Sequence, residues 1–323
     1  MWIFYRYMWL FSISISRGFC YNIENLFNWV NNMGVLYLLV NVFANQGETI
    51  LVRRFGRKYG AGGMLFNAVI CLFAMIFFFV SDSNGFRFNP DILIYGLINA
   101  ILYAAGFYFC YVAFAVGNYL LTHTITSMNF LIPIFYGLFI LKEKSGVLTY
   151  IGLLFSIASV LIMCYARWTK AKNDKKGEGI SLKWLISTLI VLFSNGFISV
   201  LSKIFQSRFQ GVYTNEYMVI TLAGSSLSLL IMGLILEGNT LRNSFRQAFL
   251  YGIGAGLCNG IKNAANLAVI LLIPLSVLTP LRKGIHIVAS FLLSHLIYKE
   301  RYTKLQYFCI LLSIISIVLM QLA

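Results

Sequence analysis

Ten apolar runs constrain this chain more than any other feature of its sequence. A helix needs about twenty apolar residues to cross the ~30 Å hydrocarbon core of a bilayer. The mean hydropathy is +0.80, and 11% of the 323 residues are charged, against about a quarter in soluble domains. The sequence therefore predicts an all-α polytopic membrane protein. Its transmembrane helices are expected at residues 33–52, 61–80, 92–116, 119–141, 147–166, 182–205, 216–236, 248–272, 274–297 and 304–322.

The formal net charge of +15 does not indicate a nucleic-acid partner, because the basic residues lie in short loops and form no continuous soluble face. Loop Lys and Arg are enriched on the cytoplasmic side of membrane proteins. The side with more Lys and Arg in its loops is therefore expected to be cytoplasmic, which places both ends of the ten-span unit outside. The expected location is the plasma membrane. Its basic residues fall within 53–58, 167–176, 242–246 and 299–304.

One hydrophilic stretch divides the chain into two halves of five spans. It is "ARWTKAKNDKKGEGIS", and its charge and glycine are typical of a hydrated linker, placed at 167–181 between repeats at 33–166 and 182–323. Residues 1–32 fit neither repeat, since "NIENLFNWVNN" is too polar to cross a membrane. They are expected to be either an interfacial aromatic segment or sequence upstream of a natural start at Met33.

The two halves resemble each other. "KEKSGVLTYIGLLFSIASVLIM" (142–163) aligns at an offset of 157 with "KERYTKLQYFCILLSIISIVLM" (299–320), so that Ser159 matches Ser316. At an offset of 150, "VFANQGETILVRRF" aligns with "LFSNGFISVLSKIF". Five spans per repeat is an odd number, so the second repeat enters from the opposite side. The sequence thus predicts two inverted five-helix repeats, an architecture suited to alternating access.

The repeat ends also resemble a known family. "FLIPIFYGLFILKEKSGVLTYIGLLFSIASVLIM" and "LTPLRKGIHIVASFLLSHLIYKERYTKLQYFCILLSIISIVLM" look like the paired signatures of EamA-like transporters, in the drug/metabolite transporter superfamily. The resemblance covers roughly Met33 to the end. It implies a small-molecule carrier whose central cavity is walled by the first four spans of each repeat, with the fifth and tenth peripheral. It does not identify the cargo.

Polar side chains inside the spans fall at helical spacing. A charge at the bilayer centre costs roughly 2.5–3.5 kcal/mol on insertion scales, so polar faces turn away from lipid. We expect the faces of spans one, three, four, six, eight and nine to converge on one cavity. The candidate substrate-binding residues are Asn45, Glu48, Asn99, Tyr103, His123, Asn129, Asn195, Asn259, Lys262, Asn263, Asn266, Arg282, Lys283 and His286.

Other interpretations remain open for several of these groups. Isolated amides and hydroxyls can bond a neighbouring helix instead, which is worth roughly 0.6 kcal/mol per contact. Lys262 lies in mid-span and favours a cavity, whereas Arg282 and Lys283 lie nearer a span end and could snorkel to the interface. Glu143 and Glu300 sit in turns and are predicted to be helix caps or partners of local lysines.

The basic residues of spans eight and nine predict an electropositive cavity. Such a site favours an anionic or zwitterionic small molecule with a carboxylate or phosphate. If transport is coupled to a proton, Glu48 and His286 are the candidates to carry it. Glu48 could instead pair with Arg53, or cancel part of the positive field. No GxxxxGK[ST] motif occurs, so drive is expected from a proton, another ion, or the cargo's own gradient.

No sequence motif indicates an enzyme, a cofactor or a metal site. HExxH and GxSxG are absent, and the six cysteines are scattered as small apolar residues would be. Two alternatives stay beside the carrier: an exporter or flippase of a lipid-linked or amphipathic cargo, and a non-transporting scaffold subunit. The inverted repeat and the buried charges favour the carrier.

Small residues and prolines inside the spans predict packing and bending. Gly252, Gly256 and Gly260 recur every four residues on span eight and are expected to seat that helix against a neighbour. Pro133, Pro274 and Pro280 are expected to kink their spans, because a proline removes a helical hydrogen bond.

Overall fold

The computed structural model describes residues 23–59, 63–82, 85–87, 89–116, 122, 125–143, 146–173, 182–237, 241–298 and 304–321. Within these ranges every regular element is a helix, which confirms the all-α class. The long helices are α2 (Ile23–Tyr59), α3 (Met64–Ser81), α4 (Pro90–Val116), α7 (Val147–Asn173), α8 (Leu182–Phe209), α9 (Thr214–Glu237), α10 (Leu241–Leu272), α11 (Leu275–Tyr298) and α12 (Lys304–Gln321). Each long helix overlaps one of the predicted apolar runs, and α2, α7 and α10 extend well beyond theirs.

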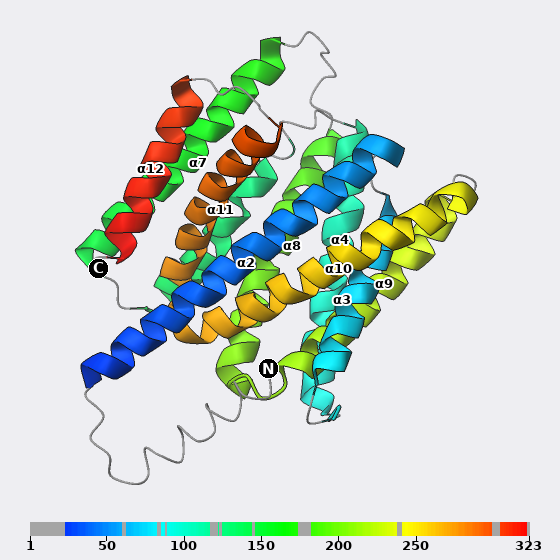
Figure 1. Ribbon diagram of the computed structural model, residues 1–323, viewed down its shortest axis with the longest axis horizontal. Coiled ribbons are helices and arrows are strands. Elements are labelled where there is room, and N and C mark those ends of the chain that lie inside the picture. Colours follow the sequence, from blue (N-terminus) through cyan, green and yellow to red (C-terminus); the bar gives the residue numbers. More distant parts are fainter. Residues whose placement is uncertain are drawn as a thin grey trace.

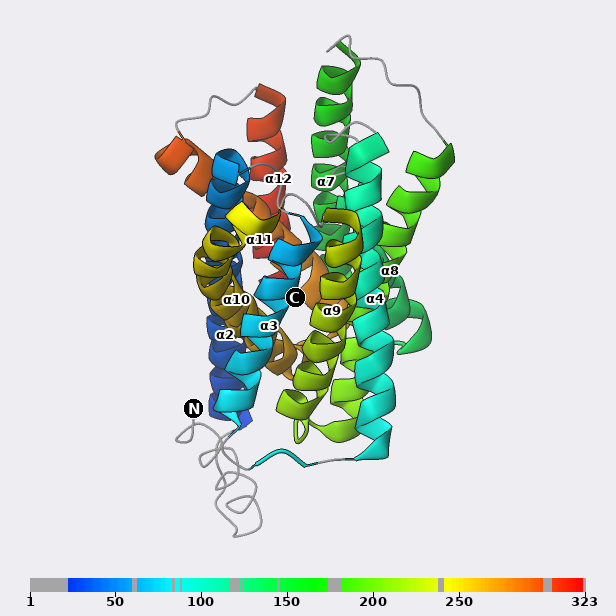
Figure 2. The same ribbon diagram turned by 90° about the vertical axis from the view of Figure 1, so that its right-hand side faces the viewer.

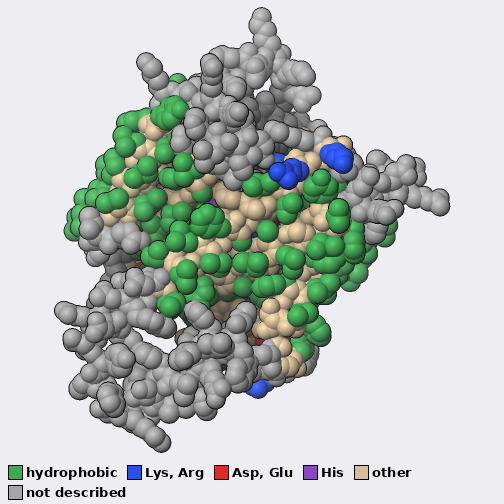
Figure 3. All heavy atoms as spheres, viewed as in Figure 1, with side chains coloured by type: hydrophobic (Ala, Val, Ile, Leu, Met, Phe, Trp, Pro, Cys, Tyr) green, Lys and Arg blue, Asp and Glu red, His purple; other side chains and the backbone are tan. Residues whose placement is uncertain are grey.

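The helices present an apolar exterior. Six of them, in the part of the chain that the structure describes, are long and apolar enough to cross a membrane. Large hydrophobic side chains such as Phe43 and Val80 are 73% and 76% exposed. Figure 3 shows hydrophobic side chains across the described part of one face, with Lys and Arg near its edges. Exposed apolar surface on this scale is favourable in lipid but not in water. The chain is a multi-pass membrane protein.

Helix α2 begins ten residues before the predicted first span, at Ile23 instead of residue 33. The polar stretch "NIENLFNWVNN" contains neither Pro nor Gly, so no residue in it breaks the helical backbone. The part of α2 that is apolar enough to span still begins at Met33. Hydropathy therefore located the membrane segment, whereas the helix continues beyond it.

The fourth predicted span is not one continuous α-helix. Its described part is a 3₁₀ turn (η1, Ser127–Phe130), one α-turn (α6, Leu131–Phe135) and a π-helical turn (η2, Tyr136–Ile140). Pro133 lies at the centre and cannot donate a backbone hydrogen bond, which accounts for the interruption. Lys142, with φ +49°, then ends the segment in a left-handed conformation. The irregularity expected at Pro133 is thus distributed over three helix types. Pro280, in contrast, lies inside the continuous helix α11.

Helices from the two halves of the chain pair with each other. The pairs are α2 with α10, α3 with α9, α4 with α8 and α7 with α12. Helix α10 also packs on α3, and α9 on α4, while α11 contacts α12, α7, α6 and α2. In Figure 1, α7 and α12 lie side by side at one end of the molecule, away from α3 and α9. Figure 2 shows the same bundle from the side on which α3, α4 and α9 face the viewer.

The glycines of α10 lie against α3, which confirms their predicted packing role. A Cβ added at Gly252 would meet Val69, and one at Gly260 would lie 2.6 Å from the ring of Phe77. At Gly256 it would lie 2.5 Å from Cβ of Phe73. Only a hydrogen at these positions lets the two helices approach so closely.

Serines join α7 to α12 by a reciprocal pair of hydrogen bonds. Ser159 Oγ donates to the carbonyl of Cys309 at 2.8 Å, and Ser316 Oγ donates to the carbonyl of Gly152 at 2.7 Å. Both serines are fully buried. Adding 157 to Ser159 gives Ser316, and adding 157 to Gly152 gives Cys309. The alignment of the two halves therefore maps each of these hydrogen bonds onto the other.

A lysine satisfies a carbonyl that a proline leaves free between α10 and α11. Pro274 has no N–H, so the carbonyl of Ile270, four residues earlier, cannot accept the usual helical hydrogen bond. Lys203 Nζ, from α8, donates to that carbonyl at 2.9 Å. A cation at a helix C-terminus is also favoured by the helix dipole. Lys203 thus stabilises the end of α10.

A carboxylate holds the other side of the same junction. Glu143 accepts hydrogen bonds from the backbone nitrogens of Leu275 at 2.9 Å and Ser276 at 2.8 Å, and from Ser276 Oγ at 2.6 Å. These are the first residues of α11, where helical N–H groups lack partners. The prediction that Glu143 is a cap is confirmed, while Glu300 lies outside the described residues.

Removal of the Glu143 carboxylate is expected to loosen the start of α11. Charge-assisted hydrogen bonds contribute roughly 1.5–3 kcal/mol, so Glu143→Ala should lower the free energy of unfolding by about 2 kcal/mol. Amide hydrogen exchange should accelerate at Leu275 and Ser276. Glu143→Gln, which keeps an acceptor oxygen, is the control and should have a smaller effect. Unchanged exchange at both amides in Glu143→Ala would contradict the capping role.

Candidate functional site

An ion pair between two apolar helices forms the centre of the site. Lys262 Nζ of α10 lies 2.5 Å from Glu48 Oε2 of α2. Asn259 Nδ2, one turn earlier on α10, donates to Glu48 Oε1 at 2.8 Å. The Lys262 and Glu48 side chains keep 22% and 16% of their surface exposed. Both carboxylate oxygens are therefore occupied, and the pair is largely but not fully shielded.

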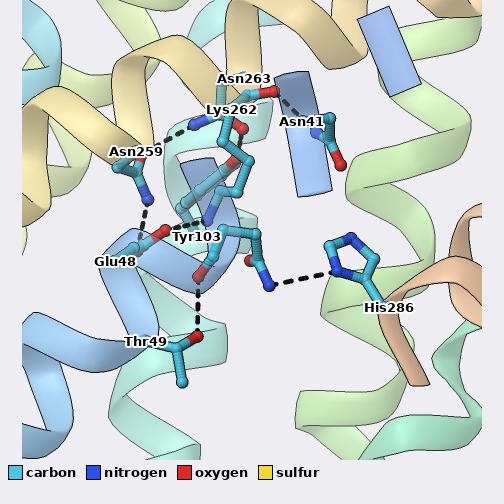
Figure 4. A network of polar contacts seen from close by, with 9 residues as sticks. Asn41, Glu48, Thr49, Tyr103, Asn259, Lys262, Asn263 and His286 are labelled. Carbon is cyan, nitrogen blue, oxygen red and sulfur yellow. Dashed lines mark hydrogen bonds and ion pairs between the residues drawn. The ribbon is translucent and has the colours of Figure 1, made fainter. Parts of the chain in front are cut away.

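Amides extend this pair along α10 and across to α4. Asn263 Nδ2 donates to Asn259 Oδ1 at 2.8 Å, and Tyr103 OH of α4 lies 3.5 Å from Asn263 Oδ1. Asn41 of α2 donates to the backbone carbonyl of Lys262 at 2.8 Å. Figure 4 shows these side chains gathered around Glu48 and Lys262. Asn259, Lys262 and Asn263 recur at three- and four-residue spacing, which brings them to one face of the helix.

Helix α11 adds a second group of polar side chains. His286 Nδ1 lies 3.4 Å from Asn45 Nδ2, and Figure 4 shows the His286 ring directed toward α2 from the neighbouring helix. The backbone carbonyl of Asn45 accepts a hydrogen bond from the Thr49 hydroxyl at 2.8 Å. Arg282 donates from Nη1 to Asn266 Oδ1 of α10. Helices α2, α4, α10 and α11 therefore all contribute to one polar region, which we call the Glu48–Lys262 cluster.

The remaining candidate residues lie outside these hydrogen bonds. Asn99 is fully buried and donates a hydrogen bond to Thr221 of α9 at 3.4 Å. It therefore joins two helices, which is the alternative role that the sequence left open for isolated amides. Asn195 of α8 is half-buried and faces Gly106 of α4, where an added Cβ would lie 3.7 Å from its Oδ1.

Three further candidates can be placed only in part. Asn129 is half-buried in η1, and Lys283 is half-buried on α11. His123 lies outside the described residues. Among the residues that the structure describes, no group of three or more His, Cys, Asp or Glu side chains could hold a metal ion.

Two residues contribute that the candidate set did not include. Asn41 donates a hydrogen bond to the backbone carbonyl of Lys262. The sequence offered a signal for it, because Asn41 lies on the same helix face as Asn45 and Glu48. Lys203 bonds the end of α10, and the available signal was its alignment with Arg53 in the internal repeat together with the proline at 274.

The pairing changes the expected electrostatics of the site. The four basic residues of α10 and α11 predicted a positive cavity. Glu48 instead neutralises Lys262 directly, and not Arg53 as the sequence allowed. The Glu48–Lys262 pair therefore offers one anionic and one cationic group side by side, with amides on their flanks. Arg282 of α11 adds a further cation to the cluster.

Comparisons with known proteins describe the fold without naming an activity. No family model matches the chain, and no curated protein matches it. One solved structure, described only as "Crystal structure of protein", aligns with a TM-score of 0.70 and 14% sequence identity. The alignment covers 90% of this chain and 96% of that chain. The chain shares its fold with that protein over nearly the whole length of both.

Proposed function

We propose that this chain is a secondary transporter that moves a small anionic or zwitterionic metabolite across the plasma membrane by alternating access. The observation that carries the proposal is the Glu48–Lys262 pair between α2 and α10. Ionisable residues inside transmembrane segments are costly, and they mark substrate and ion pathways more often than structural positions. A scaffold subunit has no need of such a pair.

The helix pairing supports an inverted repeat of the EamA type as the architecture of this carrier. In the proposed repeat, α2, α3, α4, α6 and α7 correspond to α8, α9, α10, α11 and α12. The exchange turns the pair α2–α10 into α8–α4, and α3–α10 into α9–α4, and all four pairs occur. The serine bonds between α7 and α12 exchange in the same way. Two similar halves of this kind can alternate between inward-open and outward-open states.

The chemistry of the cluster favours a zwitterionic cargo. A carboxylate or phosphate on the cargo would replace Glu48 as the partner of Lys262, through charge-assisted hydrogen bonds. An ammonium on the same cargo would take the place of Lys262 against Glu48. A molecule with both groups compensates both charges at once, and the flanking amides Asn259 and Asn263 supply directional hydrogen bonds.

The proposal is tested by identifying the cargo and then removing one charge. Metabolite profiles of cells with and without the protein should differ in polar small molecules, and those molecules should enter proteoliposomes that contain the purified chain. We expect Lys262→Met to reduce uptake at least tenfold, the size of a charge-assisted bond. Arg208→Gln, which removes an exposed ion pair with Asp91, should leave uptake unchanged.

Two outcomes would count against this function. Normal uptake by Lys262→Met would remove the Glu48–Lys262 cluster as the cargo site. Translocation of a fluorescent lipid, without uptake of any polar metabolite, would favour the flippase of a lipid-linked cargo.

A further inference from the structure

A groove opens between α4 and α8, away from the Glu48–Lys262 cluster. It has a volume of about 400 Å³, within the roughly 300–1,000 Å³ typical of sites for small organic ligands. Its walls are mainly apolar. Tyr108, Phe109 and Val112 line it from α4, and Leu182, Lys183, Ile186 and Ser187 line it from α8. In Figure 2 the first turns of α8 diverge from α4 at this end of the bundle.

The groove lies on the outer, lipid-facing surface. Leu182 and Ile186 are 72% and 48% exposed, so the groove's α8 wall belongs to the surface that faces the bilayer. Ser187, the buried polar residue of the lining, uses its hydroxyl within α8 by donating to the carbonyl of Lys183 at 2.8 Å. The apolar lining therefore offers a hydrocarbon chain contact with few competing polar groups.

One exposed cation, Lys183, lines the groove. It takes part in no ion pair with another described residue. Lys183 follows the basic segment 167–181, whose first seven residues end helix α7. It is expected to lie on the side of the protein that is rich in Lys and Arg. Basic residues at that side of a membrane attract anionic headgroups. The groove thus combines an apolar slot with a cation at the membrane surface.

We propose that this groove binds an anionic phospholipid, with an acyl chain against Tyr108, Val112 and Ile186 and the phosphate beside Lys183. The site is separate from the Glu48–Lys262 cluster and does not depend on the chain being a transporter. The lipid is recognised by two features together: the apolar lining holds the tail, and Lys183 selects the charge of the headgroup.

Native mass spectrometry of the full chain tests both features. The protein in detergent micelles is mixed with equal amounts of phosphatidylglycerol and phosphatidylcholine, and the retained lipids are counted. The wild-type chain is expected to retain one lipid, mainly phosphatidylglycerol. Lys183→Gln should lower the preference for phosphatidylglycerol about fivefold, the ratio that corresponds to ~1 kcal/mol per basic residue near the membrane surface. Arg87→Gln, which removes an exposed basic residue elsewhere, should keep the wild-type preference.

Filling the groove should remove the lipid altogether. Val112→Trp and Ile186→Trp place a ring in the slot from opposite walls, so one of them can fail to fold without ending the test. Leu234→Trp, at a 57% exposed position of α9, is the matched control and should retain the lipid. Equal retention of the two lipids by the wild-type chain, or unchanged retention by a folded Val112→Trp or Ile186→Trp variant, would overturn the proposal. A dimer mass that disappears in the tryptophan variants would assign the groove to a second copy of the chain instead.

Discussion

Glu48→Leu is expected to lose about 2–3 kcal/mol of unfolding free energy, and the double variant Glu48→Leu/Lys262→Met to recover most of it. Breaking a buried ion pair by removing one partner costs roughly 3–5 kcal/mol, because the remaining charge is left uncompensated. The Glu48 and Lys262 side chains keep 16% and 22% of their surface exposed, so the expected loss lies just below this range. Replacing both partners by apolar residues leaves no stranded charge, and such exchanges are often neutral.

The measurement is a double-mutant cycle by denaturant unfolding of the purified protein, which isolates the coupling between the two side chains. Arg208→Gln/Asp91→Asn is the control pair, since its side chains are 55% and 50% exposed and a surface pair contributes about 0–1 kcal/mol. If the losses of unfolding free energy in Glu48→Leu and Lys262→Met added up in the double variant, the two side chains would not be energetically coupled. If the chain is the proposed carrier, the recovered double variant should fold but not transport the cargo.

Gly256→Ala is expected to disrupt the contact between α10 and α3, although it adds a single methyl group. That methyl would lie 2.5 Å from Cβ of Phe73 and 2.8 Å from the carbonyl oxygen of Ile70. Neither group is the flexible end of a side chain, so the helices must separate. Overpacking typically costs about 1–3 kcal/mol and sometimes more. We expect a marked loss of monodisperse protein and a lower unfolding temperature.

Gly56→Ala is the matched control in α2. No atom lies within 4 Å of a Cβ at that position, and alanine is favoured over glycine by about 1 kcal/mol inside a helix. This variant should be as stable as the wild-type chain or slightly more so. If Gly256→Ala matched it, the close approach of α10 and α3 would not depend on glycine.

The helices of this fold could be predicted from the sequence because lipid imposes a length and an apolar composition on each span. Hydropathy could not predict how far a helix continues beyond its span, or where the helix type changes within a span. Helix α2 starts at Ile23 because helix formation continues outside the apolar stretch. The η1–α6–η2 segment depends on how the backbone around Pro133 finds alternative hydrogen bonds, and that is decided by its neighbours in space.

The site was predictable as a set of helix faces but not as a set of partners. Helical spacing brings Asn259, Lys262 and Asn263 to one face of α10. The choice of Lys262 over Arg53 as the partner of Glu48 was not accessible, because Lys262 lies 214 positions from Glu48 in the sequence. It follows from the contact of α2 with α10, which is a property of the assembled bundle. The same limit applies to Asn99, whose partner Thr221 lies on α9.

The Glu48–Lys262 pair also has an electrical consequence. Moving one elementary charge through the full membrane field changes its energy by about 2.3 kcal/mol per 100 mV. Opposite charges held 2.5 Å apart and displaced together exchange almost no work with that field. As far as these two side chains are concerned, a joint movement of α2 and α10 is therefore insensitive to voltage. A step that moves one of the two charges across the membrane without the other moves a gating charge and becomes sensitive to voltage.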